Sequence, residues 1–218
     1  MRSGLTVLIP TRSRPKRFKE AVSSLLKTSR AEVLAYLDDD DPESYPEMER
    51  VRYLRGPRLR HAKSLKILLA ESDTDFLMYG SDDILFKTDG WDSKMSAAIP
   101  EDGIGLSFAN DEWKGVASHF VFHRKWYELT GLYPDSFVHF GSDGYCVKVM
   151  EAVGRVRFLP RVTIAHMHFR NGRAGRDKTY DEEREFGDGR QELRDALREH
   201  FEKDVSILKA YLACTSTP

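Results

Sequence analysis

The chain has 218 residues, 40% of them hydrophobic and 32% charged, and its 34 lysine and arginine residues against 35 aspartate and glutamate residues leave a formal net charge of −1. This length suits one α/β domain with a sizeable core, and the ordinary globular composition excludes a disordered chain. A net charge so close to zero excludes a global electrostatic field that would select a polyanionic partner.

Apolar runs are too short for a membrane span, which excludes an integral membrane enzyme. The first run, residues 5–10, is also too short for a signal peptide and is followed by Arg12 and Arg14. Two cysteines, Cys146 and Cys214, provide neither a disulfide framework nor zinc-ligand spacing. We therefore expect a cytoplasmic chain with no membrane partner.

Apolar runs alternate with helical spacings through the first half of the chain. Residues 5–10, 32–37, 51–54 and 76–79 have the length and composition of buried strands. We expect one helix to begin at Pro15, because proline suits the first helical turn, and another to cover residues 62–69. The pair Asp41-Pro42 predicts a further helix start, with Asp41 as its N-cap. This alternation predicts the α/β class, with a mainly parallel, Rossmann-like central sheet flanked by helices.

The second half is less regular. Strands are expected over residues 104–108, 118–122 and 162–167, and helices over 126–130 and 142–154. Residues 171–188 are polar and glycine-dotted, which favours a loop, and apolar residues between 193 and 212 predict a long amphipathic C-terminal helix. We expect a single domain over residues 1–218, in which residues 1–100, 101–188 and 189–218 form successive parts.

Charged residues are unevenly distributed. Cations gather in residues 50–63 and 155–178, and carboxylates in residues 38–41, 82–83 and 181–185. Most of these side chains form, in our interpretation, a solvated surface of mixed sign. Some of the cations would instead meet phosphates, either of a nucleotide or of a nucleic acid.

Three polar clusters follow predicted strands: residues 11–14, 38–41 and 81–83. The carboxyl ends of parallel strands meet at one edge of a sheet, and open α/β sheets bind ligands there. Asp82 and Asp83 repel each other unless a cation or proton intervenes, and carboxylate oxygens suit Mg²⁺ or Mn²⁺. The alternative is an ordinary turn in which Asp83 caps the segment that follows.

Five other residues are candidates for chemistry. His166 and His168 lie two apart on a predicted strand, hence on one face, and one of them could complete a metal site begun by Asp82, although lone strand histidines are more often structural. Asp38 could accept hydrogen bonds from a nucleobase, as could Asp39; use as a phosphatase-type nucleophile is disfavoured, because such a pair usually ends the first strand. Asp143 either caps a helix or, if Ser142 is the cap, points into the cleft as a base.

Six segments in order resemble glycosyltransferase family 2 and its GT-A relatives over residues 5–170. They are Leu5-Thr-Val-Leu-Ile-Pro-Thr-Arg-Ser-Arg-Pro15, Leu37-Asp-Asp-Asp-Asp41, Arg60-His-Ala-Lys63, Tyr79-Gly-Ser-Asp-Asp83, Phe140-Gly-Ser-Asp-Gly144 and Ile164-Ala-His-Met-His168. In this resemblance Gly80 replaces the first carboxylate of the DxD metal motif, and Ser142-Asp143 replaces a Glu-Asp pair that carries the base.

The resemblance implies a GT-A fold and a non-processive, inverting hexosyltransferase that uses a UDP-sugar and Mn²⁺ or Mg²⁺. Residues 1–100 would bind the nucleotide sugar, and residues 101–188 would hold the acceptor and the catalytic base, Asp143. The implied metal ligands are Asp82, Asp83, His166 and His168. The implied donor-binding residues are Pro10, Thr11, Arg12, Arg14, Asp38, Asp39, Lys63, Ser81 and Asp82.

The sequence does not determine the chemical identity of the acceptor. Asn110, Asp111 and Trp113 are expected on the acceptor side, together with residues 137–140, because polar and aromatic groups there could hold a sugar or a base. The basic stretch at 155–178 is compatible with a nucleic-acid acceptor. In its small size and its lack of membrane attachment, the chain resembles virus-encoded transferases that act on hydroxymethylated DNA bases in the host cytoplasm; a glycan or protein acceptor is equally open. A nucleotidyltransferase and a catalytically silent sugar- or nucleic-acid-binding module are the alternatives, and the missing G-x-G-x-x-G disfavours a dehydrogenase.

Overall fold

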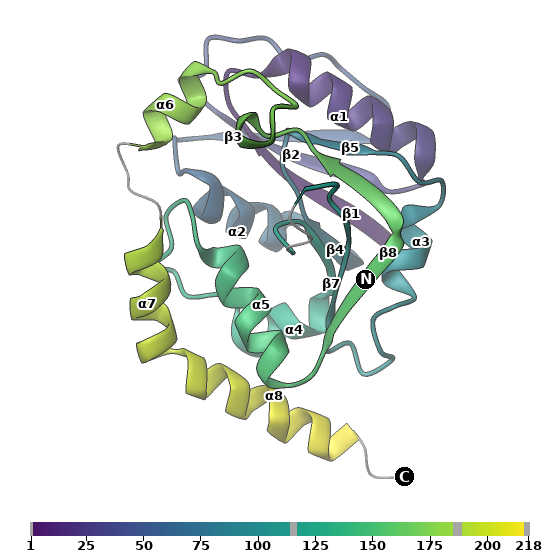
Figure 1. The fold of residues 1–218 in the computed structure, drawn as a ribbon, viewed down its shortest axis with the longest axis vertical. Coiled ribbons are helices and arrows are strands. Elements are labelled where there is room, and N and C mark those ends of the chain that lie inside the picture. The colour runs from purple at the N-terminus through teal and green to yellow at the C-terminus, as the bar shows by residue number, and fades with distance from the viewer. Residues whose placement is uncertain (1, 114–116, 185–188, 216–218) are drawn as a thin grey trace.

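The computed structural model describes residues 2–113, 117–184 and 189–215 (Figure 1). The elements in chain order are β1 (Arg2–Thr11), α1 (Pro15–Thr28), β2 (Glu32–Asp38), β3 (Val51–Gly56), α2 (His61–Glu71), β4 (Thr74–Tyr79), β5 (Ile84–Phe86), α3 (Trp91–Ser96), β6 (Leu106–Asn110), β7 (Phe120–His123), α4 (Arg124–Thr130), α5 (Ser142–Ala152), β8 (Val156–His166), the 3₁₀ turn η1 (Phe169–Asn171), α6 (Lys178–Arg184), α7 (Arg190–Glu199) and α8 (Phe201–Thr215).

The strands form one eight-stranded sheet in the order β3-β2-β1-β4-β7-β6-β8-β5. β3, β2, β1 and β4 run parallel to one another, and β6 runs parallel to β8. β7 and β5 run antiparallel to their neighbours. The α/β class and the mainly parallel sheet are therefore confirmed, and the antiparallel strands of the second half make the sheet a mixed one.

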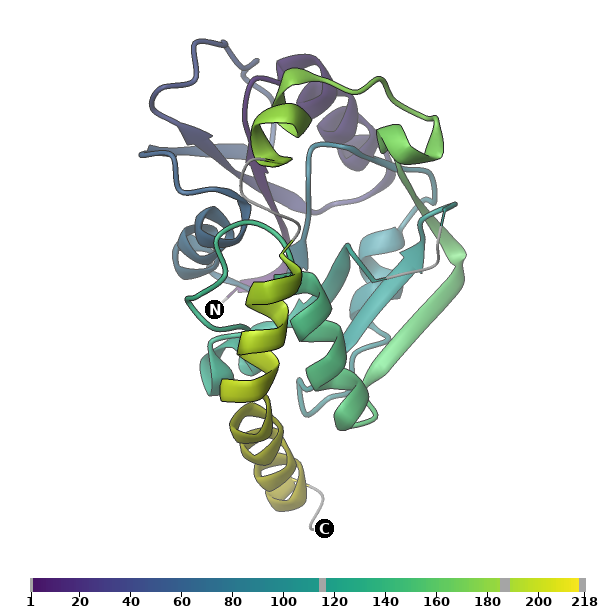
Figure 2. The ribbon, with the colours of Figure 1, turned by 60° about the vertical axis from the view of Figure 1, so that its left-hand side comes forward.

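Alternate residues of β1 enter two different cores, because successive side chains of a strand point to opposite faces. Val7 and Ile9 belong to a buried cluster with the apolar faces of α1 and α3. Leu8 belongs to a second cluster with α2, α4, α5 and α8. Helices thus cover both faces of the sheet, and α7 and α8 follow one another along the outside of α5 towards the C-terminus (Figures 1 and 2).

Two local predictions were wrong, one after β2 and one at the end of β8. No helix begins at Pro42. Asp41 instead accepts hydrogen bonds from the backbone N–H of Ser13 at 2.7 Å and from the hydroxyl of Tyr45 at 3.0 Å, which ties the loop after β1 to the loop after β2. The strand expected to hold both histidines ends at His166, and Nδ1 of His168 accepts the backbone N–H of Arg170 and caps the η1 turn.

The C-terminal part also differs from its prediction. The segment expected to be a loop contains α6, while residues 185–188 of it lie outside the described residues. The C-terminal helix is long, as expected, but it is preceded by a separate helix, α7, which ends at Glu199. Within the described ranges, every helix is too short or too polar to serve as a membrane span.

Candidate active site

The carboxyl ends of β1, β2 and β4 meet at one edge of the sheet and border a cavity of about 240 Å³. The three polar clusters predicted at strand ends all contribute to its wall, because the parallel strands that precede them are neighbours. The predicted site residues that line the cavity are Pro10, Thr11, Arg12, Arg14, Asp38, Ser81, Asp82, Asp83, Asp143, His166 and His168.

The other predicted residues lie outside this wall. Asp39 and Lys63 are exposed, and neither lines the cavity. Asp38 ends β2 buried, and Asp39 comes directly after the strand, in a turn. Asn110 ends β6, Asp111 and Trp113 come after it, and all three are absent from the cavity wall.

Arginines and carboxylates pair at the β1–β2 end of the cavity. Arg12 Nη1 lies 3.1 Å from Asp38 Oδ2, and Arg58 Nε lies 4.0 Å from the same oxygen. Burial raises the pKa of Asp38, and the hydrogen bond from Arg12 opposes this shift. This end of the cavity thus offers guanidinium donors beside one buried carboxylate acceptor.

Asp82 is held by partners from the loop after β1. Its carboxylate accepts a hydrogen bond from Thr11 Oγ1 at 2.7 Å and pairs with Arg14 Nη1 at 3.2 Å. These contacts use both carboxylate oxygens, because Thr11 reaches Oδ2 and Arg14 reaches Oδ1.

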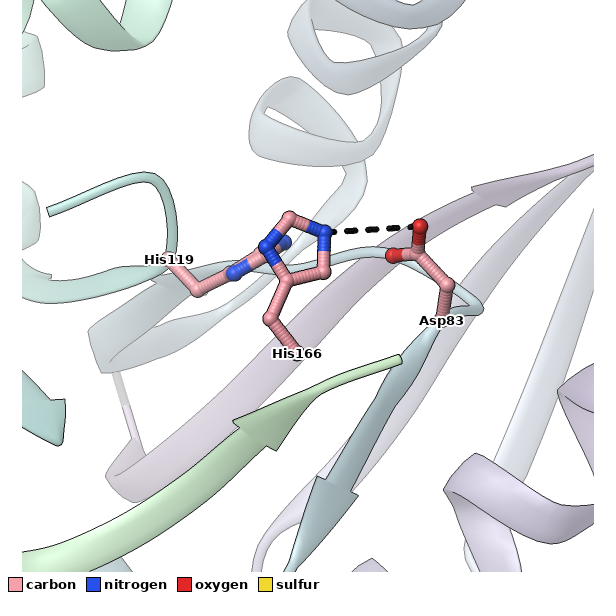
Figure 3. Close-up of side chains that lie close together, drawn as sticks. All are labelled: Asp83, His119 and His166. Atoms are coloured by element: carbon pink, nitrogen blue, oxygen red, sulfur yellow. Dashed lines mark ion pairs between the residues drawn. The ribbon is translucent and has the colours of Figure 1, made fainter. Parts of the chain in front are cut away.

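Asp83, His119 and His166 form a cluster of possible metal ligands (Figure 3). One ligand atom from each lies within 4.8 Å of the others, and His166 Nε2 is 3.4 Å from Asp83 Oδ2. Ser81 Oγ bonds both to Asp83 Oδ1 and to His119 Nε2, at 2.5 and 2.8 Å. The pairing of β5 with β8, in which Ile84 faces His166, brings Asp83, the residue directly before β5, next to the end of β8.

The chemistry of this cluster fits a divalent cation. It joins one carboxylate to two imidazoles, a donor set that suits transition metals. His166 Nδ1 is buried and has no hydrogen-bond partner within the described part of the chain, and such an orphaned polar atom calls for an explanation such as an ion. Burial acts to raise the pKa of Asp83, but the hydrogen bond from His166 and the nearby imidazoles hold that pKa well below its usual range. Desolvation lowers the pKa of His119 to about 3, which leaves this imidazole neutral and able to act as a ligand.

The sequence pattern did not reveal His119, which precedes β7 and belongs to no recognisable motif. His168 lines the cavity but is not part of the cluster. Its ring stacks on that of Trp113, with ring centroids 5.3 Å apart. The rings of Trp113 and His166 lie edge to face, with centroids 5.5 Å apart. Trp113 therefore packs beside the histidines of the site.

Asp143 lies in the first turn of α5 and faces the same cavity as the metal-ligand cluster. Desolvation raises the pKa of Asp143, although the backbone N–H groups of Asp143 and Gly144 act in the opposite direction. The N-cap of α5 is Gly141, with a φ of +91°, so the interpretation of Ser142 or Asp143 as the cap was wrong. The side chain of Ser142 is instead hydrogen-bonded to the hydroxyl of Tyr79 at 2.8 Å.

A segment between η1 and α7 lies against the arginines of the cavity. Arg14 donates to Asp177 through Nε at 3.0 Å and through Nη2 at 2.8 Å. Arg58 Nη2 donates to Glu182 Oε2 at 2.8 Å, and Thr179 lines the cavity itself. We call residues 175–182 the acidic strap, because their carboxylates hold two of the cavity arginines.

Several solved glycosyltransferases share this fold. The mannosyltransferase PcManGT from Pyrobaculum calidifontis, solved with GDP-Man and Mn²⁺, matches with a TM-score of 0.62 at 12% identity, over 100% of this chain and 77% of that one. GalNAc-T7, solved with UDP, GalNAc and Mn²⁺, matches with a TM-score of 0.62 at 13% identity, over 76% of this chain and 44% of that one. The catalytic domain of Drosophila β1,4-galactosyltransferase 7, solved with xylobiose, matches with a TM-score of 0.55 at 12% identity, over 83% and 79%. The chain therefore has the GT-A fold of nucleotide-sugar glycosyltransferases.

No protein-family profile and no curated protein sequence matches the chain. The chain spans 36% to 60% of the length of three similar structures of S. aureus TarS. At identities this low the likeness defines the fold, and activity and substrates must be argued from the site.

Proposed function

We propose that the chain is a metal-dependent glycosyltransferase that moves one hexose from a nucleoside-diphosphate sugar to an acceptor hydroxyl. The observation that carries this proposal is the shared cavity, in which the Asp83–His119–His166 cluster, the arginines and Asp143 face one another at the ligand-binding edge of the sheet. The GDP-Man, UDP and Mn²⁺ bound to structures of the same fold support a nucleoside-diphosphate donor.

The donor would lie across the ends of β1, β2 and β4. Arg12, Arg14 and Arg58 are placed to donate charge-assisted hydrogen bonds to the diphosphate. Asp38 accepts hydrogen bonds, so it suits a base that carries a ring N–H, such as uracil or guanine. We take a UDP-sugar as the first donor to test.

Asp143 would act as the general base in an inverting transfer. It takes the proton of the acceptor hydroxyl while the acceptor oxygen bonds to the anomeric carbon and the bond from that carbon to the diphosphate oxygen breaks. The nucleoside diphosphate leaves with the electron pair. A bound Mn²⁺ or Mg²⁺, held by Asp83, His119 and His166, would offset the negative charge on this leaving group.

The acceptor would enter beside Phe140, which precedes Asp143 and whose side chain is 39% exposed at the cavity wall. An exposed aromatic surface next to the base suits the flat face of a sugar ring or a base. The acceptors to test are a hydroxymethylated DNA base, a glycan and a protein hydroxyl, either glycosylated or free. Asn110, Asp111 and Trp113 do not line the cavity, so they are less suited to direct contact with the acceptor.

A donor panel tests the proposed function. The chain is incubated with UDP- and GDP-sugars and Mn²⁺, and the free nucleoside diphosphate is measured. We expect slow hydrolysis of one donor that stops when the metal is chelated and in the double variant Asp83→Asn, His119→Gln. Calorimetry of UDP and GDP with Mn²⁺ gives a second readout. A chain that neither hydrolyses nor binds any donor would be a silent module of the same fold, and the proposal would be overturned.

A further inference from the structure

A buried hydrogen bond joins the strand that leads to the metal-ligand cluster with the helix that carries Asp143. The hydroxyl of Tyr79, at the end of β4, lies 2.8 Å from Ser142 Oγ, the first residue of α5. Tyr79 is 5% exposed and Ser142 is fully buried. A hydrogen bond shielded from water in this way is costly to leave unmade, so it constrains both elements.

The Tyr79 side of this contact is rigid. Its ring stacks on Phe120 of β7 with centroids 5.2 Å apart. The next residue, Gly80, donates its N–H to the carbonyl of Leu8 at 3.1 Å. A β-carbon at Gly80 would lie 2.9 Å from that carbonyl oxygen, so the chain passes close to β1 immediately before Asp82 and Asp83. The phenol is therefore anchored to the sheet at the point where the metal-ligand segment begins.

The Ser142 side needs such an anchor. Helix α5 begins after Gly141, whose φ of +91° lies in the left-handed region, and a β-carbon there would lie 2.8 Å from the carbonyl oxygen of Gly189. The N-cap residue has no side chain, so the cap offers no side-chain hydrogen bond to the first turn. The hydrogen bond between Ser142 and Tyr79 links this turn to β4.

We infer that Tyr79, acting through Ser142, is a positioning residue that sets the place of the Asp143 carboxylate relative to the metal-ligand cluster. The inference rests on the proposed function, since it concerns the base of that reaction. Both Tyr79 and Asp143 face the cavity, and the contact spans the two elements whose relative position decides the distance between base and donor. Small displacements of reacting groups reduce rates strongly, so a loosened α5 would lower turnover without weakening donor binding.

The test compares Tyr79→Phe, Ser142→Ala and their double variant with Tyr133→Phe. Tyr133 is a matched control, because its ring packs near that of Tyr79 and its buried hydroxyl donates to the carbonyl of Ala62 at 2.7 Å instead of to α5. We expect kcat to fall about tenfold or more in Tyr79→Phe and Ser142→Ala, with the donor KM and the Mn²⁺ affinity nearly unchanged. The double variant should be no slower than the single ones, because both changes remove the same contact.

Hydrogen exchange at the start of α5 provides a readout that needs no activity. The amides of the first turn should exchange faster in Tyr79→Phe than in the wild-type chain and in Tyr133→Phe. Unchanged exchange and unchanged kcat would overturn the inference, as would an equal fall of kcat in Tyr133→Phe. A wild-type chain that transfers no sugar, but whose α5 amides respond as expected, would overturn the proposed function and leave the positioning contact in place. If Tyr79→Phe does not fold, Ser142→Ala decides the matter by the same two measurements.

Discussion

Asp82 and Asp83 are adjacent in the chain but have different partners. Asp82 bonds to Thr11 and Arg14 of the loop after β1, whereas Asp83 faces His166 and is bonded to Ser81. The family resemblance implies that both Asp82 and Asp83 are metal ligands, and this stays a prediction. The contacts favour Asp83, because the carboxylate of Asp82 already neutralises an arginine.

Matched variants separate these two carboxylates. Asp83→Asn is expected to weaken Mn²⁺ binding about tenfold or more, since it removes the charged ligand of the cluster. Asp82→Asn should change Mn²⁺ affinity much less and should alter donor binding through Arg14. Calorimetry or electron paramagnetic resonance of Mn²⁺ measures both. The opposite pattern would make Asp82 the ligand. Mg²⁺ should bind more weakly than Mn²⁺, because imidazole nitrogen suits transition metals and Mg²⁺ prefers oxygen.

Asp143→Asn is expected to lower transfer by about two orders of magnitude or more, with donor and Mn²⁺ binding retained. Because desolvation raises the pKa of Asp143, the acid limb of kcat in the wild-type chain should lie above the ordinary carboxyl value of 3.8. Kinetics over a pH series measures this limb. Glu151→Gln, an exposed change on the same helix, is the control and should keep full activity.

The raised pKa also has a consequence for stability. A carboxyl whose pKa is higher in the folded state binds its proton more tightly there, so its ionised form destabilises the fold above that pKa. Asp143→Asn should therefore raise the Tm at neutral pH, and the difference should vanish as the pH falls below the ordinary value. A Tm lowered at neutral pH would contradict this assignment of a desolvated, ionised base.

At the scale of elements, the acidic strap pairs with the arginines that the proposed donor would need. Asp177 bonds to two nitrogens of Arg14, and Glu182 bonds to Arg58. A diphosphate that reaches Arg14 must replace or rearrange the contact with Asp177. We therefore expect the strap to weaken donor binding by the net stabilisation of these part-exposed ion pairs.

Asp177→Asn is expected to tighten the binding of UDP with Mn²⁺ about two- to fivefold, as the loss of a part-exposed ion pair predicts. Asp181→Asn is the matched control, because it removes the same charge from the same segment but its partner is Arg176 within that segment. Calorimetry of nucleotide binding gives both affinities. Weaker binding by Asp177→Asn would mean instead that Asp177 holds Arg14 in its binding position.

At the scale of the whole molecule, the C-terminal helices pack against α5, the helix that carries Asp143. Tyr145 of α5 donates a hydrogen bond to Asp204 of α8 at 2.7 Å, and Leu208 of α8 is fully buried in the cluster that also holds α4 and α5. Since this cluster continues to β1 and β4, we expect α8 to unfold in the same cooperative unit as the site.

Leu208→Ala should lower the free energy of unfolding by about 2–5 kcal/mol, because it removes buried methyl groups and leaves a cavity. Ile67→Ala is the control, since Ile67 is 41% exposed and surface changes of this kind usually alter stability by only about 0.5 kcal/mol. Urea unfolding followed by circular dichroism measures both. An unchanged midpoint for Leu208→Ala, or a separate early transition, would show that α8 is not part of the unit.

Much of this fold could be predicted from local pattern. The strands at β1, β2 and β4 and the helix start at Pro15 follow from apolar runs and from the conformation of proline, which depend on neighbours in the chain. The edge that carries the site also follows, because parallel strands joined by helices bring their carboxyl ends together. These features determine the α/β class and the general location of the cavity.

Tertiary structure decided which side chains meet there. His119 comes from the segment before β7 and joins Asp83 and His166 through the pairing of β4 with β7 and of β5 with β8. Asp41 is used to join two loops, and Ser142 to join α5 to β4. Such contacts join residues far apart in the chain. Local sequence patterns do not predict them, because they depend on the order in which the strands pack into the sheet.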